Sequence, residues 1–294
     1  MSNRPEVTLA ATAHEPAVTL PAIGQGTWFM GEGYATHEEE VSALKEGLDH
    51  GLTLIDTAEM YAEGQAEKVV GDALKGRRDE AFVTSKVYPW NAGRDTAMKA
   101  CEDSLQRLGT DYLDLYLLHW PGGIPIDETL EAFERLRDAG KIRRFGVSNF
   151  DVEDMRALID RPGGEACAAN EVLYHLGSRG IEYSLTPWQR AHDIPVIAYC
   201  PLAQGGRLRR DMLDHPDLLA TAAELDLTPA QLLLAWTIRP VEDQHNILAV
   251  PKAAQRQHVR DNAAALNASL GDDILARLNS IFPSAVAKEP LDMV

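Results

Sequence analysis

Four residues whose side chains could do chemistry together follow successive apolar runs of the chain: Asp56, Tyr61, Lys86 and His119. From Asp56 to Lys86 is 30 residues and from Lys86 to His119 is 33, the length of one strand and one helix with their loops. In a barrel of parallel strands, the carboxyl ends of all strands open at one mouth. The spacing therefore predicts that these four side chains meet at one site.

An aspartate, a tyrosine, a lysine and a histidine can together protonate an oxygen that gains negative charge. Free tyrosine has a pKa of about 10, too high for an efficient general acid near neutral pH. We expect the Lys86 ammonium to lower the pKa of Tyr61, and Asp56 to keep the lysine charged. His119 could orient or polarise a carbonyl oxygen. This set indicates a site that protonates a carbonyl oxygen while hydride reaches the carbon.

The elements that must position these residues alternate regularly along the chain. Eight short apolar runs are separated by amphipathic stretches of about a dozen residues, the pattern of βα units around a parallel sheet, and eight strands close a (β/α)8 barrel. We predict one (β/α)8 barrel domain over residues 1–294, with a hairpin within Val7–Leu20 across its bottom and cofactor and substrate loops towards the C-terminus. The predicted strands are Ala22–Gly26, Thr53–Asp56, Phe82–Lys86, Leu113–Leu118, Arg144–Val147, Ala168–Val172, Val196–Tyr199 and Ile247–Val250.

Helices are predicted where apolar residues recur at three- and four-residue steps. Capping boxes mark two of their starts, at Thr36 and at Thr228. No linker or low-complexity tract interrupts the series, which favours a single domain. The predicted helices are His37–His50, Gln65–Lys75, Thr96–Leu108, Glu128–Ala139, Val152–Asp160 and Pro229–Ile238.

The composition of the 294 residues limits the class of protein. With 45% hydrophobic and 25% charged residues, the chain is typical of globular proteins. Its 28 basic and 45 acidic residues give a net charge of −17, which argues against nucleic acid or an anionic membrane surface as a partner. Three cysteines without CxxC spacing and no apolar signal segment predict a cytoplasmic protein with reduced thiols. The sequence has no G-x-G-x-x-G, phosphate-loop or zinc signature, and we expect no metal.

Eight short blocks occur in the order found in a known family. The chain resembles the aldo-keto reductases, NAD(P)H-dependent oxidoreductases built on the (β/α)8 barrel, over nearly its whole length. The blocks are Gly26-Thr27-Trp28, Asp56-Thr57-Ala58 with Tyr61, Ser85-Lys86, Leu117-Leu118-His119-Trp120-Pro121, Gly146-Val147-Ser148-Asn149-Phe150, Asn170-Glu171 with Tyr174-His175, Tyr199-Cys200-Pro201-Leu202 and Val250-Pro251-Lys252.

The resemblance implies an NADPH-dependent reductase of small aldehydes and ketones, with NAD(H) as a possible cofactor and a monomer as its state. It implies a catalytic tetrad of Asp56, Tyr61, Lys86 and His119, with Tyr61 as general acid. By the same resemblance, the residues that would hold the cofactor are Gly26, Thr27, Trp28, Asp56, Ser148, Asn149, Glu171, Tyr199, Pro201, Leu202, Lys252, Ala253, His258, Asp261 and Asn262. The substrate side would be walled by Trp28, Tyr88, Trp90, His119 and Trp120.

Two positions depart from the family pattern. Glu171 stands where the family often has glutamine, and the bacterial branch that this chain resembles carries glutamate there. His258 replaces a common arginine, which is the better partner for a phosphate. Lys252, with Arg256 or Arg260 nearby, still favours NADPH.

The loops that narrow substrate choice in this family are short in this chain. The stretch Trp120–Ile126 is brief, and so is the tail after Ser280. We therefore expect an open pocket that accepts a range of small carbonyl compounds.

Three other functions fit parts of the same pattern. A barrel glycosidase could use Asp56, Glu59 or Glu171 as a carboxylate pair, but this leaves Lys86 and Tyr199 unexplained. A Schiff-base aldolase would need Lys86 neutral, which a neighbouring Asp56 opposes. From a different class, a regulatory subunit would bind the cofactor without significant turnover.

Overall fold

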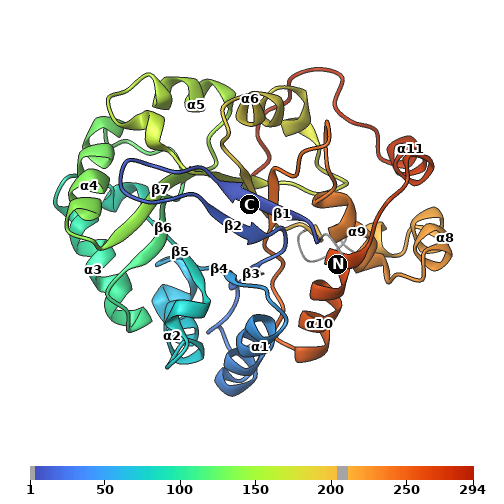
Figure 1. The fold of residues 1–294 in the computed structure, drawn as a ribbon, viewed down its shortest axis with the longest axis horizontal. Coiled ribbons are helices and arrows are strands. Elements are labelled where there is room, and N and C mark those ends of the chain that lie inside the picture. The colour runs from blue at the N-terminus through green and yellow to red at the C-terminus, as the bar shows by residue number, and fades with distance from the viewer. Residues whose placement is uncertain (1–3, 204–210) are drawn as a thin grey trace.

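The computed structural model describes residues 4–203 and 211–294 of the chain. Within them, eight parallel strands form a nearly closed barrel with helices around it, in the order β10-β9-β8-β7-β6-β5-β4-β3 (Figure 1). This confirms the predicted (β/α)8 fold. The barrel strands are β3 (Gln25–Gly26), β4 (Leu54–Asp56), β5 (Phe82–Val87), β6 (Leu113–Leu118), β7 (Ile142–Ser148), β8 (Asn170–Leu173), β9 (Val196–Tyr199) and β10 (Ile247–Ala249).

The first predicted strand is longer than the one observed. We predicted Ala22–Gly26, whereas only Gln25 and Gly26 form a ladder with β4. The residues before them instead bond to β10, where Gly24 N donates to Ala249 O at 2.8 Å, and this contact brings the two ends of the sheet together. A Cβ on Gly26 would lie 2.5 Å from Val250 O, so this close approach requires glycine.

The predicted hairpin is present ahead of the barrel. Strands β1 (Glu6–Leu9) and β2 (Val18–Pro21) pair antiparallel and lie across the middle of the view in Figure 1. Leu9 and Leu20 are buried in the same apolar cluster as Leu54 and Phe82, which begin strands β4 and β5. The hairpin therefore covers the amino end of the barrel and leaves the opposite end for the site.

All six predicted helices are present, and both capping boxes form. Thr36 Oγ1 accepts from Glu39 N and Thr228 Oγ1 accepts from Gln231 N, each at 3.2 Å. The pattern missed helices α6, α8, α10 and α11, which are short. The helices are α1 (His37–Asp49), α2 (Gln65–Ala73), α3 (Thr96–Leu108), α4 (Ile126–Asp138), α5 (Val152–Ile159), α6 (Leu185–Ala191), α8 (Pro216–Glu224), α9 (Pro229–Thr237), α10 (Arg256–Ala264) and α11 (Asp272–Ile281).

Aromatic packing between strands and helices fixes the outer layer. Phe133 of α4 is buried between Tyr116 of β6 and Phe145 of β7, with ring centroids 5.6 and 5.5 Å away. Such pairs add to the stabilisation from burial. They hold neighbouring strands in register, so that the strand ends lie at one level.

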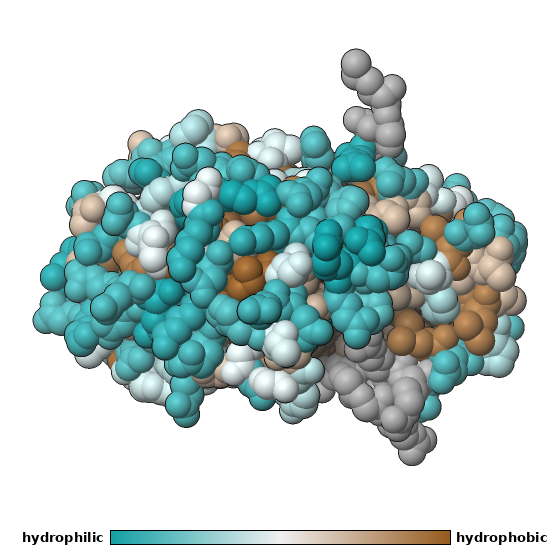
Figure 2. Space-filling view, turned by 90° about the horizontal axis from the view of Figure 1, so that it is seen from below, coloured by the Kyte–Doolittle hydropathy of each residue, from teal (hydrophilic) through white to brown (hydrophobic). Residues whose placement is uncertain are grey.

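The outer surface is mainly polar. Figure 2 shows a mostly hydrophilic face on which apolar residues form small, separate patches. No single helix in the described part of the chain is long and apolar enough to cross a membrane. Helices α8 and α9 meet that criterion only when taken together across an 85° bend.

Candidate active site

A cavity of about 410 Å³ opens at the carboxyl ends of the strands. Asp56 ends β4, Ser148 ends β7 and Tyr199 ends β9, and all three line the cavity. His119 directly follows β6 and also lines it. The strand ends therefore converge on one pocket, as the spacing predicted.

The structure brings the four residues of the expected tetrad together. Lys86, fully buried on β5, donates from Nζ to Asp56 Oδ1 at 2.6 Å and to Tyr61 Oη at 3.1 Å. Tyr61 begins a 3-10 helix, Tyr61–Gly64, and its ring centroid lies 5.9 Å from that of His119. A hydrogen-bonded chain thus runs from Asp56 through Lys86 to Tyr61 beside the imidazole.

Burial dominates the electrostatics of Tyr61. It raises the pKa of this phenol above its ordinary value, although the Lys86 charge acts in the opposite direction, and the negative charge of Asp56 raises the pKa further. Lys86 acts in the direction that the sequence predicted, but in the free protein desolvation of the phenolate outweighs this attraction. Tyr61 holds its proton and remains able to donate it.

Lys86 and His119 take opposite charge states. Burial disfavours the charge of Lys86, but Asp56, Glu171 and Tyr61 together raise its pKa. Burial, and then the positive charge of Lys86, lower the pKa of His119 to about 2. Near neutral pH the lysine is therefore an ammonium and the histidine a neutral imidazole.

Glu171 joins this cluster from β8. It is 1% exposed, and its Oε1 lies 3.3 Å from Lys86 Nζ. Burial and the neighbouring charge of Asp56 raise the pKa of Glu171 well above its ordinary value, against the effect of Lys86. The second oxygen, Oε2, has no hydrogen-bond partner within the described ranges.

The pocket contains ten of the fifteen residues expected to hold the cofactor: Gly26, Trp28, Asp56, Ser148, Asn149, Glu171, Tyr199, Pro201, Leu202 and Lys252. Asn149 is held in place because it accepts from Tyr199 Oη at 2.9 Å and donates to His119 O at 3.1 Å. The remaining five, Thr27, Ala253, His258, Asp261 and Asn262, do not line the pocket.

Thr27 lies just beneath the pocket, fully buried, where its hydroxyl donates to Asp56 O at 2.9 Å. His258 is exposed on α10. The nearby arginines bind elsewhere, because Arg256 Nε and Arg260 Nη1 donate to Glu46 of α1 at 2.6 and 2.9 Å. The expected help of these arginines toward a phosphate is thus not seen, because α1 engages them.

The lining chemically fits a nicotinamide dinucleotide. Glu171 Oε2 is a buried acceptor without a partner among the described residues, suited to an amide donor. Tyr199 offers an aromatic face at the end of β9, and Lys252 a positive charge at the lining after β10. These three groups suit an amide, a planar ring and a phosphate, respectively.

Comparison with known proteins settles the family. The model of the Aldo/keto reductase family matches residues 22–282. The chain belongs to this family. Methylglyoxal reductase YeaE of Escherichia coli is 54% identical over 277 residues, which cover 94% of this aldo/keto reductase and 96% of that protein.

Solved structures agree with this assignment. An aldo/keto reductase from Klebsiella pneumoniae, in complex with NADP and acetate, has 55% sequence identity and a TM-score of 0.93. The match covers 99% of this chain and 100% of that one. More distantly, a glyoxal reductase of Bacillus subtilis is 32% identical over 267 residues, with 90% of each protein covered.

The substrate side of this aldo/keto reductase is partly as expected. Trp28, His119 and Trp120 line the pocket, whereas Tyr88 and Trp90 do not. Trp90 is 61% exposed and stacks on Tyr88 with ring centroids 4.2 Å apart. These two aromatic residues pack a neighbouring loop, because their rings cover each other and the edge of Trp120.

Several pocket residues of the reductase were not predicted. Phe29 stacks on Trp28 with ring centroids 4.4 Å apart, and Tyr34 meets Phe29 edge-on at 6.0 Å. Because both residues lie close to Trp28 in the sequence, that closeness could have indicated that they line the pocket. The other unpredicted lining residues are Met60, Cys200, Ala203, Val250, Pro251 and Val294.

The chain's tail limits the open pocket that the sequence suggested. Lys288 Nζ lies 3.0 Å from Asp151 Oδ2, and Ser178 Oγ donates to Asp292 Oδ2 at 2.5 Å. These contacts lead the tail to the mouth, where Val294 lines the pocket. The pocket is therefore partly covered on that side.

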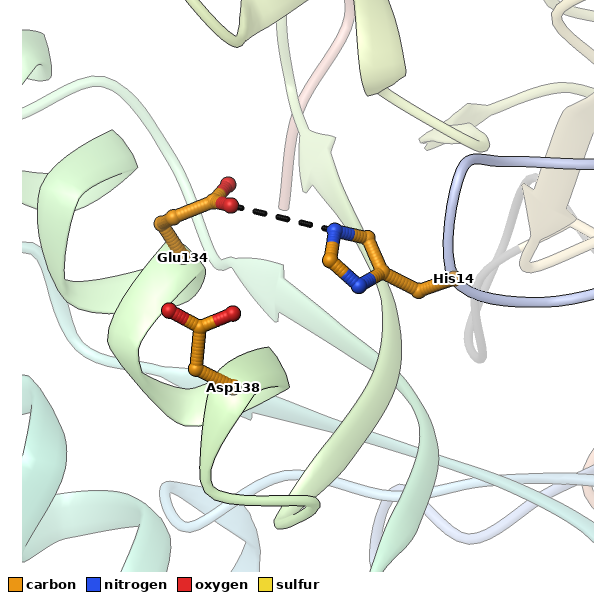
Figure 3. Close-up of side chains that lie close together, drawn as sticks. All are labelled: His14, Glu134 and Asp138. Atoms are coloured by element: carbon orange, nitrogen blue, oxygen red, sulfur yellow. Dashed lines mark ion pairs between the residues drawn. The ribbon is translucent and has the colours of Figure 1, made fainter.

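A separate polar cluster lies away from the pocket. Figure 3 shows the side chains of His14, Glu134 and Asp138 close together. Their possible ligand atoms lie within 4.8 Å of one another. His14 and Asp138 are exposed, and Glu134 already pairs with Arg137. We interpret this group as surface ion pairs between the hairpin loop and α4.

Proposed function

We propose that this aldo/keto reductase uses NADPH to reduce small aldehydes and ketones, including dicarbonyl compounds such as methylglyoxal, to alcohols. The observation that carries the proposal is the hydrogen-bonded chain Asp56–Lys86–Tyr61 beside a neutral His119 at the pocket. The similarity to methylglyoxal reductase YeaE and to structures holding NADP and NADPH supports it.

Tyr61 is the general acid. Its Oη donates a proton to the carbonyl oxygen as negative charge develops there. Lys86 lies 3.1 Å from Oη and stabilises the phenolate that remains, while Asp56 keeps the lysine oriented. Neutral His119 can donate a hydrogen bond to the same carbonyl oxygen. The bound cofactor supplies the hydride.

The cofactor would lie along the side of the pocket formed by β7 to β10. Tyr199 would stack on the nicotinamide ring, while Ser148 and Asn149 bind its carboxamide. Lys252 would pair with the 2′-phosphate, since neither Arg256 nor Arg260 lines the pocket. Preference for NADPH would then rest mainly on this lysine.

The geometry disfavours the other enzymatic candidates. Lys86 is held as an ammonium by Asp56, which opposes the neutral amine that a Schiff-base aldolase needs. Asp56 and Glu171 bind the same lysine instead of flanking the pocket as an acid and a nucleophile. Neither comparison nor geometry favours a regulatory subunit over an enzyme.

The test follows the loss of reduced-nicotinamide absorbance with NADPH or NADH and a panel that includes methylglyoxal and a nitrobenzaldehyde. We expect turnover with several aldehydes and a preference for NADPH. Tight nucleotide binding without turnover would instead favour a regulatory subunit. Borohydride trapping at Lys86 would indicate an aldolase, and release of reducing sugar a glycosidase.

We further propose a monomeric, cytoplasmic enzyme of one domain. Every group assigned to the reaction lies on one barrel. Cys101, Cys167 and Cys200 are free thiols, which fits a reducing compartment. Sedimentation of the purified protein would test the monomer.

A further inference from the structure

The proposed mechanism gives Glu171 no part in proton transfer. Its Oε1 lies 3.3 Å from Lys86 Nζ, and the residue is 1% exposed. Its Oε2 has no partner among the described residues, and the residue lines the pocket. Glu171 is therefore a buried carboxyl group in the wall of the pocket, with one oxygen unpartnered among the described residues.

Two carboxyl groups share one ammonium here. Lys86 Nζ is closer to Asp56 Oδ1, at 2.6 Å, than to Glu171 Oε1. If both carboxyl groups were ionised, one negative charge would remain uncompensated in a buried site, which is costly. Burial and the charge of Asp56 accordingly raise the pKa of Glu171 well above its ordinary value. The nearer ammonium stabilises ionised Asp56 more strongly, which leaves Glu171 as the carboxyl group that is more easily protonated.

A hydride donor that works with Tyr61 must lie in the pocket that Glu171 also lines. The carbonyl oxygen has to reach Tyr61 Oη, and the reacting carbon must come within about 3–3.5 Å of the donor. Lys86 Nζ is within hydrogen-bonding distance of Tyr61 Oη and 3.3 Å from Glu171 Oε1. A nicotinamide ring bound in this pocket would therefore face the side of the wall to which Glu171 belongs.

We propose that Glu171 distinguishes the oxidation states of the cofactor by charge: it keeps its proton beside the reduced ring and releases it to solvent when the oxidised, cationic ring fills the pocket. With NADPH, Lys86 balances Asp56 and Glu171 is neutral. With NADP⁺, Lys86 and the ring balance two carboxylates. The net charge of the site is therefore zero in both complexes. One proton is released when NADP⁺ binds, and none when NADPH binds.

This inference rests on the proposed function, because it requires the nicotinamide ring in the pocket. Among the neighbouring titratable groups, Glu171 is the one whose protonation would change when the cofactor binds. Burial raises the pKa values of Tyr61, Tyr199 and Cys200, so these three are neutral near neutral pH, and Lys86 stays charged. The titratable groups facing Glu171 are Asp56 from β4, Tyr61 from the turn after it, Lys86 from β5, and Tyr199 and Cys200 at the end of β9.

The first test compares how the dissociation constants of NADP⁺ and NADPH depend on pH. Both constants are measured by the quenching of tryptophan fluorescence. Release of one proton makes NADP⁺ affinity rise by up to tenfold per pH unit below the pKa of Glu171. NADPH affinity should change only through the 2′-phosphate, whose titration both cofactors share. The difference between the two slopes therefore reports Glu171.

Two variants sharpen this comparison. Glu171→Gln keeps the size and polarity of the side chain but cannot titrate, and we expect it to remove the difference in slope. The matched control is Glu59→Gln, because Glu59 is also a partly buried carboxyl group with a raised pKa but does not line the pocket. This control should keep the wild-type slopes. A slope difference that survives in Glu171→Gln would overturn the inference.

Calorimetry of the wild-type protein gives the proton count without any variant. Titrations are carried out in buffers of different ionisation heat. After subtraction of the protons exchanged by the 2′-phosphate, which both cofactors share, we expect about one proton released per NADP⁺ bound and none per NADPH bound. Equal proton counts for both cofactors, in a protein that still reduces aldehydes, would refute the role of Glu171 but not the proposed function. A protein that binds neither cofactor would refute the proposed function itself.

Discussion

Replacement of Tyr61 by phenylalanine tests the proton donor directly. The variant loses only the hydroxyl group, and Lys86 Nζ keeps its bonds to Asp56 Oδ1 at 2.6 Å and to Thr57 O at 3.0 Å. The pocket should therefore keep its shape and its affinity for NADPH. Loss of a positioned general acid lowers turnover by about 10²- to 10⁴-fold.

At about 1.4 kcal/mol per factor of ten, this loss raises the barrier by about 3–5 kcal/mol. The assay measures kcat with methylglyoxal and NADPH, together with NADPH affinity by fluorescence. Tyr116→Phe is the matched control, because Tyr116 is a buried tyrosine whose hydroxyl has no partner among the described residues and lies outside the pocket. We expect its kcat to stay near that of the wild type.

The reasoning fails if Tyr61→Phe keeps kcat within a few-fold of the wild type. It also fails if both tyrosine variants lose activity equally, because the loss would then reflect general damage to the barrel. A fall in NADPH affinity as large as the fall in kcat would place Tyr61 in cofactor binding instead.

Three further predictions address the cofactor, the core and the surface charges. Lys252→Met should weaken NADPH by about tenfold or more, as expected for loss of a charge-assisted hydrogen bond, and leave NADH nearly unchanged; equal losses for both cofactors, measured by fluorescence titration, would remove Lys252 from the 2′-phosphate. Phe133→Ala should lower the free energy of unfolding by about 3–5 kcal/mol in urea titrations, because Phe133 is 1% exposed between two aromatic rings; Phe133→Leu should lose clearly less, and similar losses would contradict the packing argument. Hydrogen bonds from Arg260 and Arg256 lower the pKa of Glu46 to about 2, so its stabilising effect is complete above its unfolded pKa of about 4.5 and is lost as the pH falls towards 2; Glu46→Gln should therefore lower the melting temperature at neutral pH, and the gap from the wild type should close as the solution is acidified.

The barrel, and the meeting of Asp56, Lys86 and His119 at one mouth, could be predicted from the sequence because both follow from local periodicity. The role of these residues as a tetrad with Tyr61 was implied by the family resemblance. Each strand and helix shows its own apolar pattern, and a strand end such as Asp56 or Lys86 reaches the same mouth once the strands are parallel. The positions of the four groups of the proposed tetrad therefore depended on the spacing of the units and not on details of packing. The first strand was predicted too long because its early residues bond to β10, a contact between the two ends of the sheet that no local pattern records.

Only the tertiary structure decided the charge states and the final partners. The pKa of Tyr61 rises because burial outweighs the nearby ammonium, and the extent of burial depends on every element around the pocket. Arg256 pairs with Glu46, 210 residues earlier, and Asp56 and Glu171, on β4 and β8, both lie within 3.3 Å of Lys86 Nζ. Desolvation and competition between distant charges are properties of the packed molecule, so residue types and their spacing along the chain do not determine them.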